Sequence, residues 1–361
     1  MIRRFWAAVI RPIDMPLLAT AATLIGIAFV VLASASPDRL ASQAVNITVA
    51  LVVMRVVAQM SPQRLMHAAL PLYLTGVALL IAVALFGDVS KGARRWLNIG
   101  VTRIQPSEIM KIAMPLMLAW YFQKREIAIR FHDYLVAAAL LLVPVGLIAK
   151  QPDLGTAILV LSSGFYVIFF AGLSWKFIIG LGVAGLGAIP LVWPLLHDYQ
   201  RARVLTLFDP ESDPLGKGFH IIQSTIAIGS GGLFGKGWGQ GTQTQLEFIP
   251  ERHTDFIFAV VSEEWGLLGN LVLLVIYLLL IARGLTIAAN APTLFTRLLA
   301  GAITLMFFTY AFVNMGMVSG ILPVVGVPLP FISYGGTALV TLFLGIGILM
   351  SIHKNPMLVQ K

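Results

Sequence analysis

The sequence predicts an all-α integral membrane protein, a single polytopic domain over residues 1–361 with ten transmembrane helices. Hydrophobic residues make up 58% of the 361 residues, and charged residues make up 11%. The mean hydropathy is +0.89. Because soluble domains carry roughly 25% charged residues, this deficit of charge requires a surrounding of lipid. The chain has no cysteine, which excludes disulfides, thiolate metal sites and a cysteine nucleophile.

Ten stretches of the chain are long and apolar enough to cross a bilayer, whose hydrocarbon core of about 30 Å requires roughly 20 residues of helix. They cover residues 15–35, 44–60, 65–87, 106–122, 134–150, 154–172, 174–196, 256–282, 295–318 and 330–352. The predictions for the second and fourth spans are weaker than the others, because Arg55 and Lys111 lie inside these spans or near their ends. The first follows Arg3 and Arg4, as in a signal peptide, but its apolar run is too long, and we expect an uncleaved helix.

The distribution of lysine and arginine predicts the orientation of these helices, because short cytoplasmic loops are enriched in both residues. The segments that fall on one side contain Arg3, Arg4, Arg11, Arg64, Lys124, Arg125, Arg130, Arg283, Arg297, Lys354 and Lys361. We therefore expect both termini in the cytoplasm and one large periplasmic loop, residues 197–255, between helices seven and eight. Because this topology accounts for much of the net charge of +9, we expect no nucleic acid as a partner.

Two segments on the outer side oppose this distribution of charge. Residues 88–108 include Lys91, Arg94, Arg95 and Arg103, and residues 197–255 include Arg201, Arg203, Lys217, Lys236 and Arg252. Long loops cross the membrane regardless of charge, which explains the second segment and only part of the first. For the first segment we favour a function, the binding of an anionic ligand at the outer leaflet.

The large loop contains recurring aromatic and aliphatic residues, so we expect it to fold onto the membrane domain. Residues 218–232 are typical of a short amphipathic helix at the interface. The glycine-rich stretch 229–241 is no Walker motif, because Ser230 and Gly237 replace the required residues. Its glycines either bring backbone amides to a ligand or permit tight turns. The histidines at 197, 220 and 253 lack the spacing of a zinc site and are expected to be polar or interfacial.

Ionisable residues inside predicted spans indicate function, because burying them in lipid is costly. Glu108 and Lys111 lie three residues apart, on one face of helix four, where they are either functional or a mutually neutralising pair. Asp153 lies at the turn before helix six, where it is either functional or the helix cap. Glu263 and Glu264 lie within helix eight and would hold it to its neighbours by hydrogen bonds.

Asp255 lies at the outer start of helix eight, on the side that carries the exceptional cations. Two interpretations stay open from the pattern alone. Thr254 or Asp255 is well placed to cap the helix, and an acid there suits the helix dipole. An acid at the membrane–water boundary is equally a candidate general base.

Long motifs in these segments resemble the SEDS family, named for shape, elongation, division and sporulation. They are GARRWLNIG at 92–100, QPSEIMK at 105–111, QPDLGTA at 151–157, GFHIIQS at 218–224, the run from GSGGLFGKG to EEWGLLG at 229–269, and PLPFISYGG at 328–336. The motifs occur in family order and cover nearly the whole chain. One departure is GGTA at 335–338, where the family commonly has Ser after the glycines; Thr337 keeps the hydroxyl.

The resemblance implies a multi-pass protein of the bacterial cytoplasmic (inner) membrane that polymerises lipid II into glycan strands at its outer face, with the active site toward the periplasm. It implies Asp255 as the catalytic acid. The short N-terminal segment is more similar to the elongation members of the family than to its division members, which remain an alternative. The implied partners are lipid II, an undecaprenyl-pyrophosphate-linked glycan strand, a class B penicillin-binding protein that acts as transpeptidase, and the elongation machinery.

The reaction requires a base for the attacking sugar hydroxyl and positive charge for the departing pyrophosphate. We assign the base to Asp255 and substrate contacts to Arg94, Arg95, Trp96, Arg103, Glu108, Lys111, Gln151, Asp153, Arg201, Arg203, Gln223 and Ser333. Trp96 is alternatively an interfacial anchor. No cofactor is certain, and a divalent cation, Mg²⁺ or Mn²⁺, is a candidate beside Glu108 or Asp153. The competing function is a lipid II flippase, which would also use outer cations and intramembrane carboxylates.

Overall fold

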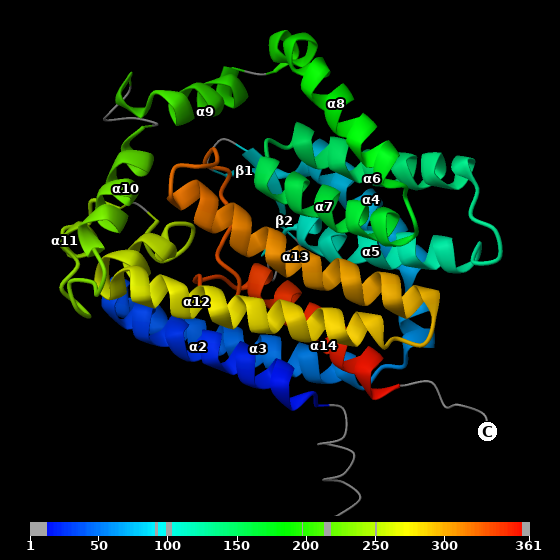
Figure 1. Ribbon diagram of the computed structural model, residues 1–361, viewed down its shortest axis with the longest axis horizontal. Helices are drawn as coiled ribbons and strands as arrows, with labels where there is room; N and C mark the ends of the chain where they lie inside the picture. The colour runs from blue at the N-terminus through cyan, green and yellow to red at the C-terminus, as the bar shows by residue number, and fades with distance from the viewer. Residues whose placement is uncertain are drawn as a thin grey trace, which may run out of the picture.

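The computed structural model describes residues 13–90, 93–98, 103–196, 198–212, 218–249 and 251–355. It is helical apart from one small sheet (Figure 1). The elements are α2 (Met15–Ala35), η1 (Pro37–Arg39), α3 (Leu40–Ala58), α4 (Pro62–Phe86), β1 (Asp88–Ser90), β2 (Ala93–Asn98), β3 (Arg103–Ile104), α5 (Pro106–Gln123), α6 (Phe131–Lys150), α7 (Leu154–Phe170), α8 (Trp175–Val192), η2 (Trp193–Leu195), α9 (Asp198–Phe208), η3 (Pro210–Ser212), α10 (Phe219–Gly231), α11 (Thr242–Gln245), α12 (Ile257–Ala289), α13 (Leu294–Val318) and α14 (Thr337–Lys354).

A helix of the structure overlaps each of the ten predicted spans, namely α2 to α8 and α12 to α14. Within the described ranges, eight helices are long and apolar enough to cross a membrane, and α7 is a shorter apolar helix. A helical membrane protein with many spans is therefore confirmed, whereas the number of ten crossings and the position of the termini stay predictions. The last helix begins seven residues later than expected, at Thr337. Pro328 and Pro330 lack the N–H of a helix, and Phe331 has a positive φ of 65°.

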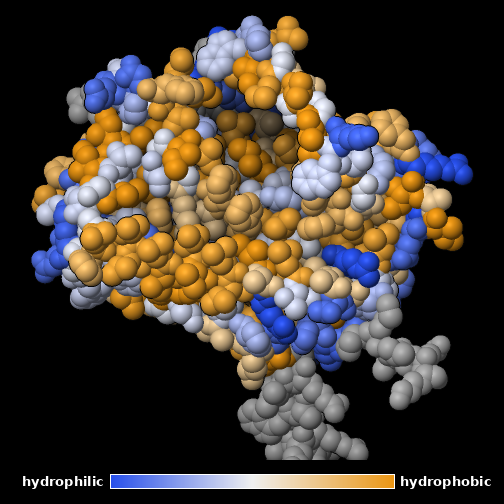
Figure 2. Space-filling model, viewed as in Figure 1, coloured by the Kyte–Doolittle hydropathy of each residue, from blue (hydrophilic) through white to orange (hydrophobic). Residues whose placement is uncertain are grey.

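Two helices form the centre of the bundle. Nearly all of α5 and most of α13 are buried, and they pack against each other and against α7. Around them, α3 packs against α14, α4 against α5, and α12 against α2 and α13. Polar side chains on α5 and α13 are therefore shielded from lipid. The outer surface of the bundle is largely apolar (Figure 2).

The helix α8 differs from the other apolar helices, because none of its residues is buried. It contacts the bundle near its start, where Trp175 lies against Phe169 and Phe177 against Phe131. The rest of α8 diverges toward α9, and the surface is hollowed beneath the two helices (Figures 1 and 2). An apolar helix with this exposure requires lipid on its free sides.

The basic segment 88–108 folds partly as an antiparallel sheet in the order β1-β2-β3. Val89 pairs with Arg94 and Asn98 with Arg103. The sheet lies against α4 and α5. It brings two of the predicted cation positions, Arg94 and Arg103, onto neighbouring strands.

The part of the large loop around residues 219–245 folds onto the bundle, as expected. The predicted helix at 218–232 is confirmed as α10, which packs against α12. The glycine-rich stretch follows it. Gly235, Gly237 and Gly239 all have positive φ, so the turns here require glycine.

The predicted span at 256–282 is not one continuous helix, because α12 is broken at Gly266, with φ 66° and ψ −160°. The Oγ of Ser262 lies 3.1 Å from Oδ1 of Asn270, whereas the two residues would be about 12 Å apart along a straight helix. Phe258 shares an apolar groove with Leu274 and Leu278. The first turns of α12 therefore fold back along the rest of the helix.

The glycine-rich loop supplies hydrogen bonds at both sides of this break. The amides of Lys236 and Gly237 donate to the carbonyls of Glu263 and Glu264, at 3.0 Å each. The amides at 267 and 268 donate to the carbonyls at 232 and 233, at 2.9 and 3.1 Å. These amides serve the fold, so the interpretation of the glycines as permitting turns holds here. The lipid-facing part of α12 begins after the break, with exposed Leu267 and Leu268.

Candidate active site

Asp255 is half-buried and lies directly before the folded-back part of α12. The expectation that Thr254 or Asp255 caps this helix is wrong. Phe256 occupies the N-cap position, and no side chain caps the first turn. The hydroxyl of Thr254 instead donates to the carbonyl and the carboxylate of Glu251, at 3.2 Å each. The carboxylate of Asp255 is therefore not used as a helix cap.

The backbone around Asp255 is fixed by side chains from α13 and from the loop before α14. The amide of Asn314, fully buried on α13, donates to the carbonyl of Asp255 and to that of Val327, at 2.7 Å each. The hydroxyl of Ser333 donates to the carbonyl of Thr254 at 2.7 Å. Ser333 also accepts the amide of residue 329 at 2.8 Å. Ser333, predicted as a substrate contact, thus has its hydroxyl committed to positioning the segment before Asp255.

The loop before α14 separates Asp255 from the start of α7. Gly326 has a φ of +73°, and a Cβ built on it would lie 3.3 Å from Oδ2 of Asp255. On the other side, a Cβ on Gly155 would lie 2.6 Å from the carbonyl oxygen of Val325. Glycine at both positions permits this close approach. The QPDLGTA motif is thereby brought next to the segment that contacts Asp255.

The predicted cap at the start of α7 is confirmed. Asp153 accepts the amide of Thr156 at 3.3 Å, and it also accepts the side-chain amide of Gln105 at 3.0 Å. The Nη2 of Arg95 donates to the carbonyl of the neighbouring residue 152. The side-chain amide of Gln151 donates to the carbonyl of Leu80 at 3.0 Å. This junction therefore joins the sheet, α4, α5 and α7.

Glu108 and Lys111 form the predicted ion pair, with 2.6 Å between Oε1 and Nζ. Lys111 also donates to the hydroxyl of Tyr310 at 2.6 Å, and Thr341 donates to the other carboxylate oxygen at 3.1 Å. Lys111 is 1% exposed and Glu108 is 8% exposed. Because a buried charge is costly without a partner, each of the two residues requires the other. The pair links α5 to α13 and α14 inside the bundle.

The other predicted cations have different positions. Arg94 and Arg103 are exposed on the sheet. Trp96, which follows Arg94 on the same strand, is half-buried. Arg201 donates to the carbonyls at 193 and 194, at 3.1 and 2.6 Å, and so ties α9 to η2. The side chain of Arg203 lies outside the described residues, as do Lys91, Lys217 and His197. Gln223 is half-buried on α10.

Three residues of this region were not predicted. Asn314, Tyr310 and Thr341 hold Asp255, Lys111 and Glu108 respectively. All three are polar side chains inside apolar spans, which is the signal that could have identified them. Because they carry no charge, they do not stand out against the other hydroxyls and amides of the spans.

A groove of about 690 Å³ opens between α3, α4, α5 and α14. Its polar end is lined by Gln105, Glu108 and Thr337, and its apolar walls continue to Leu65 and Ile348. From residue 337 to residue 348 the groove follows α14 for about 16 Å. An apolar groove with one polar end suits a lipid whose head carries the polar groups.

Two histidines of the large loop lie near Asp255: His253 is two residues before it in the chain, and His220 contacts the residue after it. The ring of His220 stacks on Phe256, with 5.4 Å between the centroids. Burial lowers the pKa of His220, with a partial opposing effect of Glu251. Burial also lowers the pKa of His253, helped by the charge of Arg39. In the described part of the chain, no three His, Asp or Glu side chains gather as a metal site would require.

Glu263 and Glu264 hold the glycine-rich loop and α2. Glu263 is fully buried and accepts Nζ of Lys236 at 2.8 Å, the amide of Gln243 at 2.9 Å and both the amide and the hydroxyl of Thr244, at 3.1 and 2.9 Å. Glu264 accepts the hydroxyl of Ser34 on α2. The predicted structural role of these acids is confirmed, and they stabilise the break in α12.

Known proteins match this chain over most of its length. A family model for cell cycle proteins, named for FtsW, RodA and SpoVE, matches residues 14–357. The peptidoglycan glycosyltransferase MrdB of Escherichia coli K12 is 57% identical over 318 residues, which is 88% of this chain and 86% of MrdB. The probable peptidoglycan glycosyltransferase FtsW of Geobacter metallireducens is 38% identical, over 80% of this chain and 77% of that protein.

Solved structures show the same fold. A chain from a peptidoglycan synthase complex, in which polymerization and crosslinking are coordinated, matches with a TM-score of 0.82 and 39% identity. The match covers 94% of this chain and 97% of that one. The rod shape determining protein RodA of Thermus thermophilus matches with a TM-score of 0.71 and 34% identity, over 94% and 96% of the two chains.

Proposed function

This chain belongs to the family of FtsW, RodA and SpoVE cell cycle proteins, and from this premise we propose how it acts as a peptidoglycan glycosyltransferase. It polymerises lipid II into glycan strands during elongation and rod-shape maintenance. The identity of 57% to MrdB, against 38% to the FtsW relative, supports the elongation role over the division role. The observation that carries the proposal is the placement of Asp255, which is half-buried, uncommitted to capping and held through its backbone by Asn314.

Asp255 acts as the general base. The 4-hydroxyl of the lipid II sugar attacks the anomeric carbon at the reducing end of the growing strand. As the new C–O bond forms, the carboxylate of Asp255 takes the hydroxyl proton, and the bond to undecaprenyl pyrophosphate breaks. Proton transfer of this kind contributes about 10²–10⁴-fold in rate. The backbone contacts of Asn314 and Ser333 support a fixed position for this carboxylate.

Arginines of the sheet bind the departing pyrophosphate. Arg94 and Arg103 are exposed on neighbouring strands, and Arg95 lies against the turn that contains Asp153. Guanidinium groups suit phosphate oxygens because they donate two parallel hydrogen bonds. Lys111 has its charge balanced by Glu108, so we assign it to holding the site rather than to supplying net positive charge. Trp96, Gln151 and Gln223 complete the candidate substrate contacts, with Arg201 and Arg203 farther along the large loop.

The groove between α3, α4, α5 and α14 takes a prenyl tail. Its walls are apolar, and its polar end is formed by Gln105 and by Glu108 of the buried pair with Lys111. A tail in this groove would place its pyrophosphate near the sheet that carries the arginines. The described residues do not fit the divalent cation considered beside Glu108 or Asp153, because the carboxylate oxygens of Glu108 accept from Lys111 and Thr341, and those of Asp153 accept from Thr156 and Gln105. We therefore route no step through a metal ion.

The site lies on the periplasmic side of the inner membrane, and both termini lie in the cytoplasm. Support comes from the lysines and arginines of the opposite segments. The chain has no cysteine, so one cysteine placed at exposed Arg103 can be labelled in intact cells by a membrane-impermeant maleimide. Labelling only after the membrane is opened would contradict this orientation.

A class B penicillin-binding protein is the proposed partner. The solved complex that resembles this chain coordinates polymerization with crosslinking, which supports a transpeptidase beside the polymerase. Other proteins of the elongation machinery would assemble around the polymerase and the transpeptidase.

The decisive experiment incubates purified protein, with its partner, with lipid II in detergent and measures glycan polymer. A polymerase gives long strands and releases undecaprenyl pyrophosphate. A flippase would instead move labelled lipid II across vesicles without forming polymer, and would be expected to hold its key charges near the midplane. Lipid movement without polymer would overturn the proposed function.

A further inference from the structure

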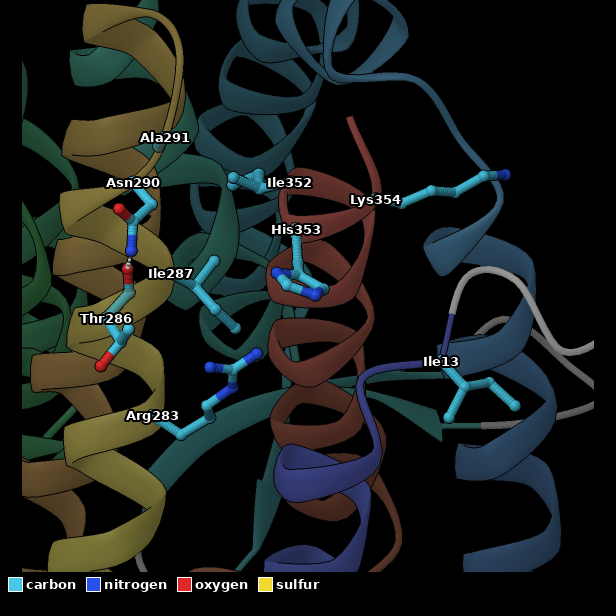
Figure 3. A pocket seen from close by; sticks show the side chains of 9 residues that line it. All are labelled: Ile13, Arg283, Thr286, Ile287, Asn290, Ala291, Ile352, His353 and Lys354. Carbon is cyan, nitrogen blue, oxygen red and sulfur yellow. Dashed lines mark hydrogen bonds between the residues drawn. The ribbon is translucent and has the colours of Figure 1, made fainter. Parts of the chain in front are cut away.

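A second cavity opens at the end of the bundle opposite Asp255. Its volume is about 640 Å³, and it lies between the end of α12, Ile13 ahead of α2 and the end of α14 (Figure 3). The helix α13 separates the two ends. It starts close to this cavity, and Asn314, which holds Asp255, lies about 30 Å along it. The cavity is therefore separate from the site proposed for glycosyl transfer.

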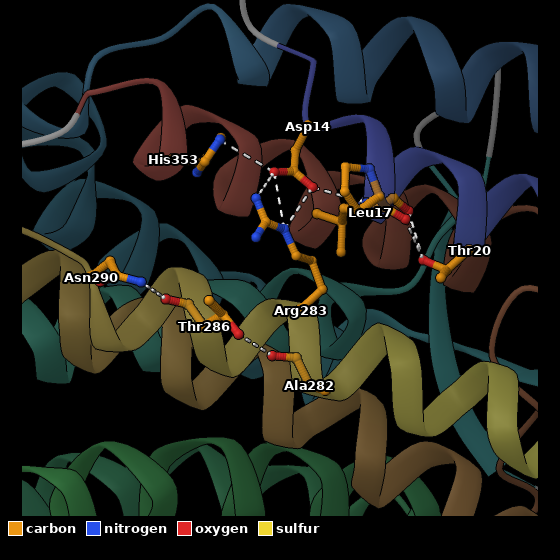
Figure 4. A network of polar contacts seen from close by, with 9 residues as sticks. Asp14, Leu17, Thr20, Ala282, Arg283, Thr286, Asn290 and His353 are labelled. Carbon is orange, nitrogen blue, oxygen red and sulfur yellow. Dashed lines mark hydrogen bonds and ion pairs between the residues drawn. The ribbon is translucent and has the colours of Figure 1, made fainter.

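Arg283 lines this cavity and is anchored by one edge of its guanidinium. Its Nε and Nη2 donate to the carboxylate of Asp14, with distances of 3.1 and 2.5 Å to Oδ1 and Oδ2 (Figure 4). Asp14 is 2% exposed and also accepts the amide of Leu17 at 2.9 Å. Burial raises the pKa of Asp14, but the hydrogen bonds from Arg283 and Leu17 outweigh this, so the net shift is downward and Asp14 is ionised.

The other edge of the same guanidinium has no described partner. Nη1 of Arg283 makes no hydrogen bond within the part of the chain that the structure describes, and Figure 3 shows the group between α12 and α14, facing the cavity. Arginine carries five N–H donors in a planar fork, so it can hold one oxyanion at each edge. A second oxyanion in the cavity would satisfy Nη1 without breaking the pair with Asp14.

The remaining lining combines positive charge with apolar walls. His353 and Lys354 end α14, and in the described ranges Lys354 has no anionic partner. Arg283 and Lys354 each carry a permanent positive charge. Asp14 balances that of Arg283, so one positive charge remains in excess at the cavity. Ile287 and Ile352 supply apolar surface. Cations at the ends of α12 and α14 suit the helix dipoles, but that role requires neither a cavity nor a free guanidinium edge.

We propose that this cavity binds the phosphate of an anionic phospholipid headgroup, with Nη1 of Arg283 and Nζ of Lys354 as donors. The cavity lies at the ends of apolar helices, the depth at which headgroups meet a membrane protein. Basic pockets between transmembrane helices at this depth recognise such headgroups. Ile287 and Ile352 face the glycerol and the first methylene groups. The bound lipid would bridge α12 and α14, and α12 carries the break that leads to Asp255.

The test measures binding of phosphatidylglycerol to the full, delipidated protein in neutral detergent, by native mass spectrometry and by the shift in Tm. We expect one retained lipid and a raised Tm. Arg283→Lys keeps the charge that pairs with Asp14 but removes the second edge. Lys354→Gln removes an exposed charge and leaves that pair intact, so it stays informative if Arg283→Lys is poorly folded. Lys354→Gln should weaken binding roughly fivefold, as expected for about 1 kcal/mol per cation. Arg283→Lys should weaken it by a similar factor, because it removes the hydrogen bond from Nη1, which contributes about 1 kcal/mol.

The matched control is Arg297→Gln, an exposed arginine in the first turn of α13 that does not line the cavity. It should leave binding unchanged. Equal affinity of wild type and both variants would overturn the proposal, as would equal binding of phosphatidylcholine. Inorganic phosphate alone giving the full Tm shift would assign the cavity to a free phosphate and overturn the lipid assignment. None of these readouts uses polymerisation, so they are independent of the proposed function.

Discussion

Asn314 is the residue whose replacement tests most sharply how Asp255 is positioned. Its side-chain amide makes two hydrogen bonds of 2.7 Å, to the carbonyls of Asp255 and Val327, and it is fully buried. Asn314→Ala removes both donors and leaves two buried carbonyls without them. We expect the segment that contains Asp255 to shift, and the rate of polymerisation to fall.

The size of this effect follows from the two lost hydrogen bonds. Each neutral hydrogen bond contributes about 0.5–1.5 kcal/mol, so the pair contributes about 1–3 kcal/mol. If that energy positions the base in the transition state, kcat falls by roughly 5- to 150-fold, since each 1.4 kcal/mol corresponds to a factor of ten. The KM for lipid II should change little, because Asn314 is buried away from the groove.

The assay compares kcat, KM and Tm for wild type, Asn314→Ala, Asp255→Asn and the double variant. Thr304→Val is the matched control, a buried polar residue of the same helix whose hydroxyl bonds to its own helix at residue 300. In the Asp255→Asn background, Asn314→Ala should cause little further loss of rate, because the base it positions is already gone. Independent, additive losses, or a lowered Tm with unchanged kcat, would refute the positioning role.

Three further predictions concern the buried ion pair of Glu108 and Lys111, the groove between α3, α4, α5 and α14, and the histidines of the large loop. Lys111→Met should abolish activity and lower the free energy of unfolding by about 3–5 kcal/mol, measured by denaturation, because it leaves a buried carboxylate unpaired; a variant of unchanged stability would contradict the pairing. Val340→Trp should fill the groove and raise KM for lipid II with little change in Tm, whereas Val272→Trp, on the exposed face of α12, should not. Because the pKa values of His220 and His253 lie below their ordinary 6.5, the unfolded chain binds protons first as the pH falls. Stability should therefore decrease below pH 6.5, and a flat Tm between pH 7.5 and 5.5 would contradict this.

The sequence predicted the parts of the fold that depend on long apolar runs and on charge. Spans of about 20 apolar residues are visible locally, and so are the basic segment at 88–108 and the acid at 255. The pair of Glu108 and Lys111 was also predictable, because a spacing of three places both on one helix face. The cap role of Asp153 followed from its position before α7.

The break in α12 could not be predicted in the same way. The residues on both sides of Gly266 suit a continuous helix, and a single glycine in a helix is tolerated. What allows the fold-back is a distant loop, whose amides at Lys236 and Gly237 replace the lost helical hydrogen bonds. Capping by Thr254 or Asp255 was wrong because the helix starts at Ile257, with Phe256 at the N-cap position, and the carbonyls of Thr254 and Asp255 are held by Ser333 and Asn314 from other parts of the chain.

The sheet and the inner polar contacts were missed for a related reason. Its strands are two to six residues long, too short for periodicity to separate them from a loop. Asn314 and Tyr310 are uncharged, and their importance depends on what α5 and the loop before α14 bring beside them. Such partners are set by tertiary packing rather than by local pattern.

In the proposed mechanism, the carboxylate of Asp255 takes the proton of the attacking hydroxyl. The most direct measurement is polymerisation of lipid II by purified Asp255→Asn with its partner, alongside wild type, with Tm as a check of folding. Because Asn has similar shape and no basicity, we predict a loss of at least about 100-fold in rate at unchanged Tm. A folded Asp255→Asn protein that polymerises at the wild-type rate would contradict the mechanism.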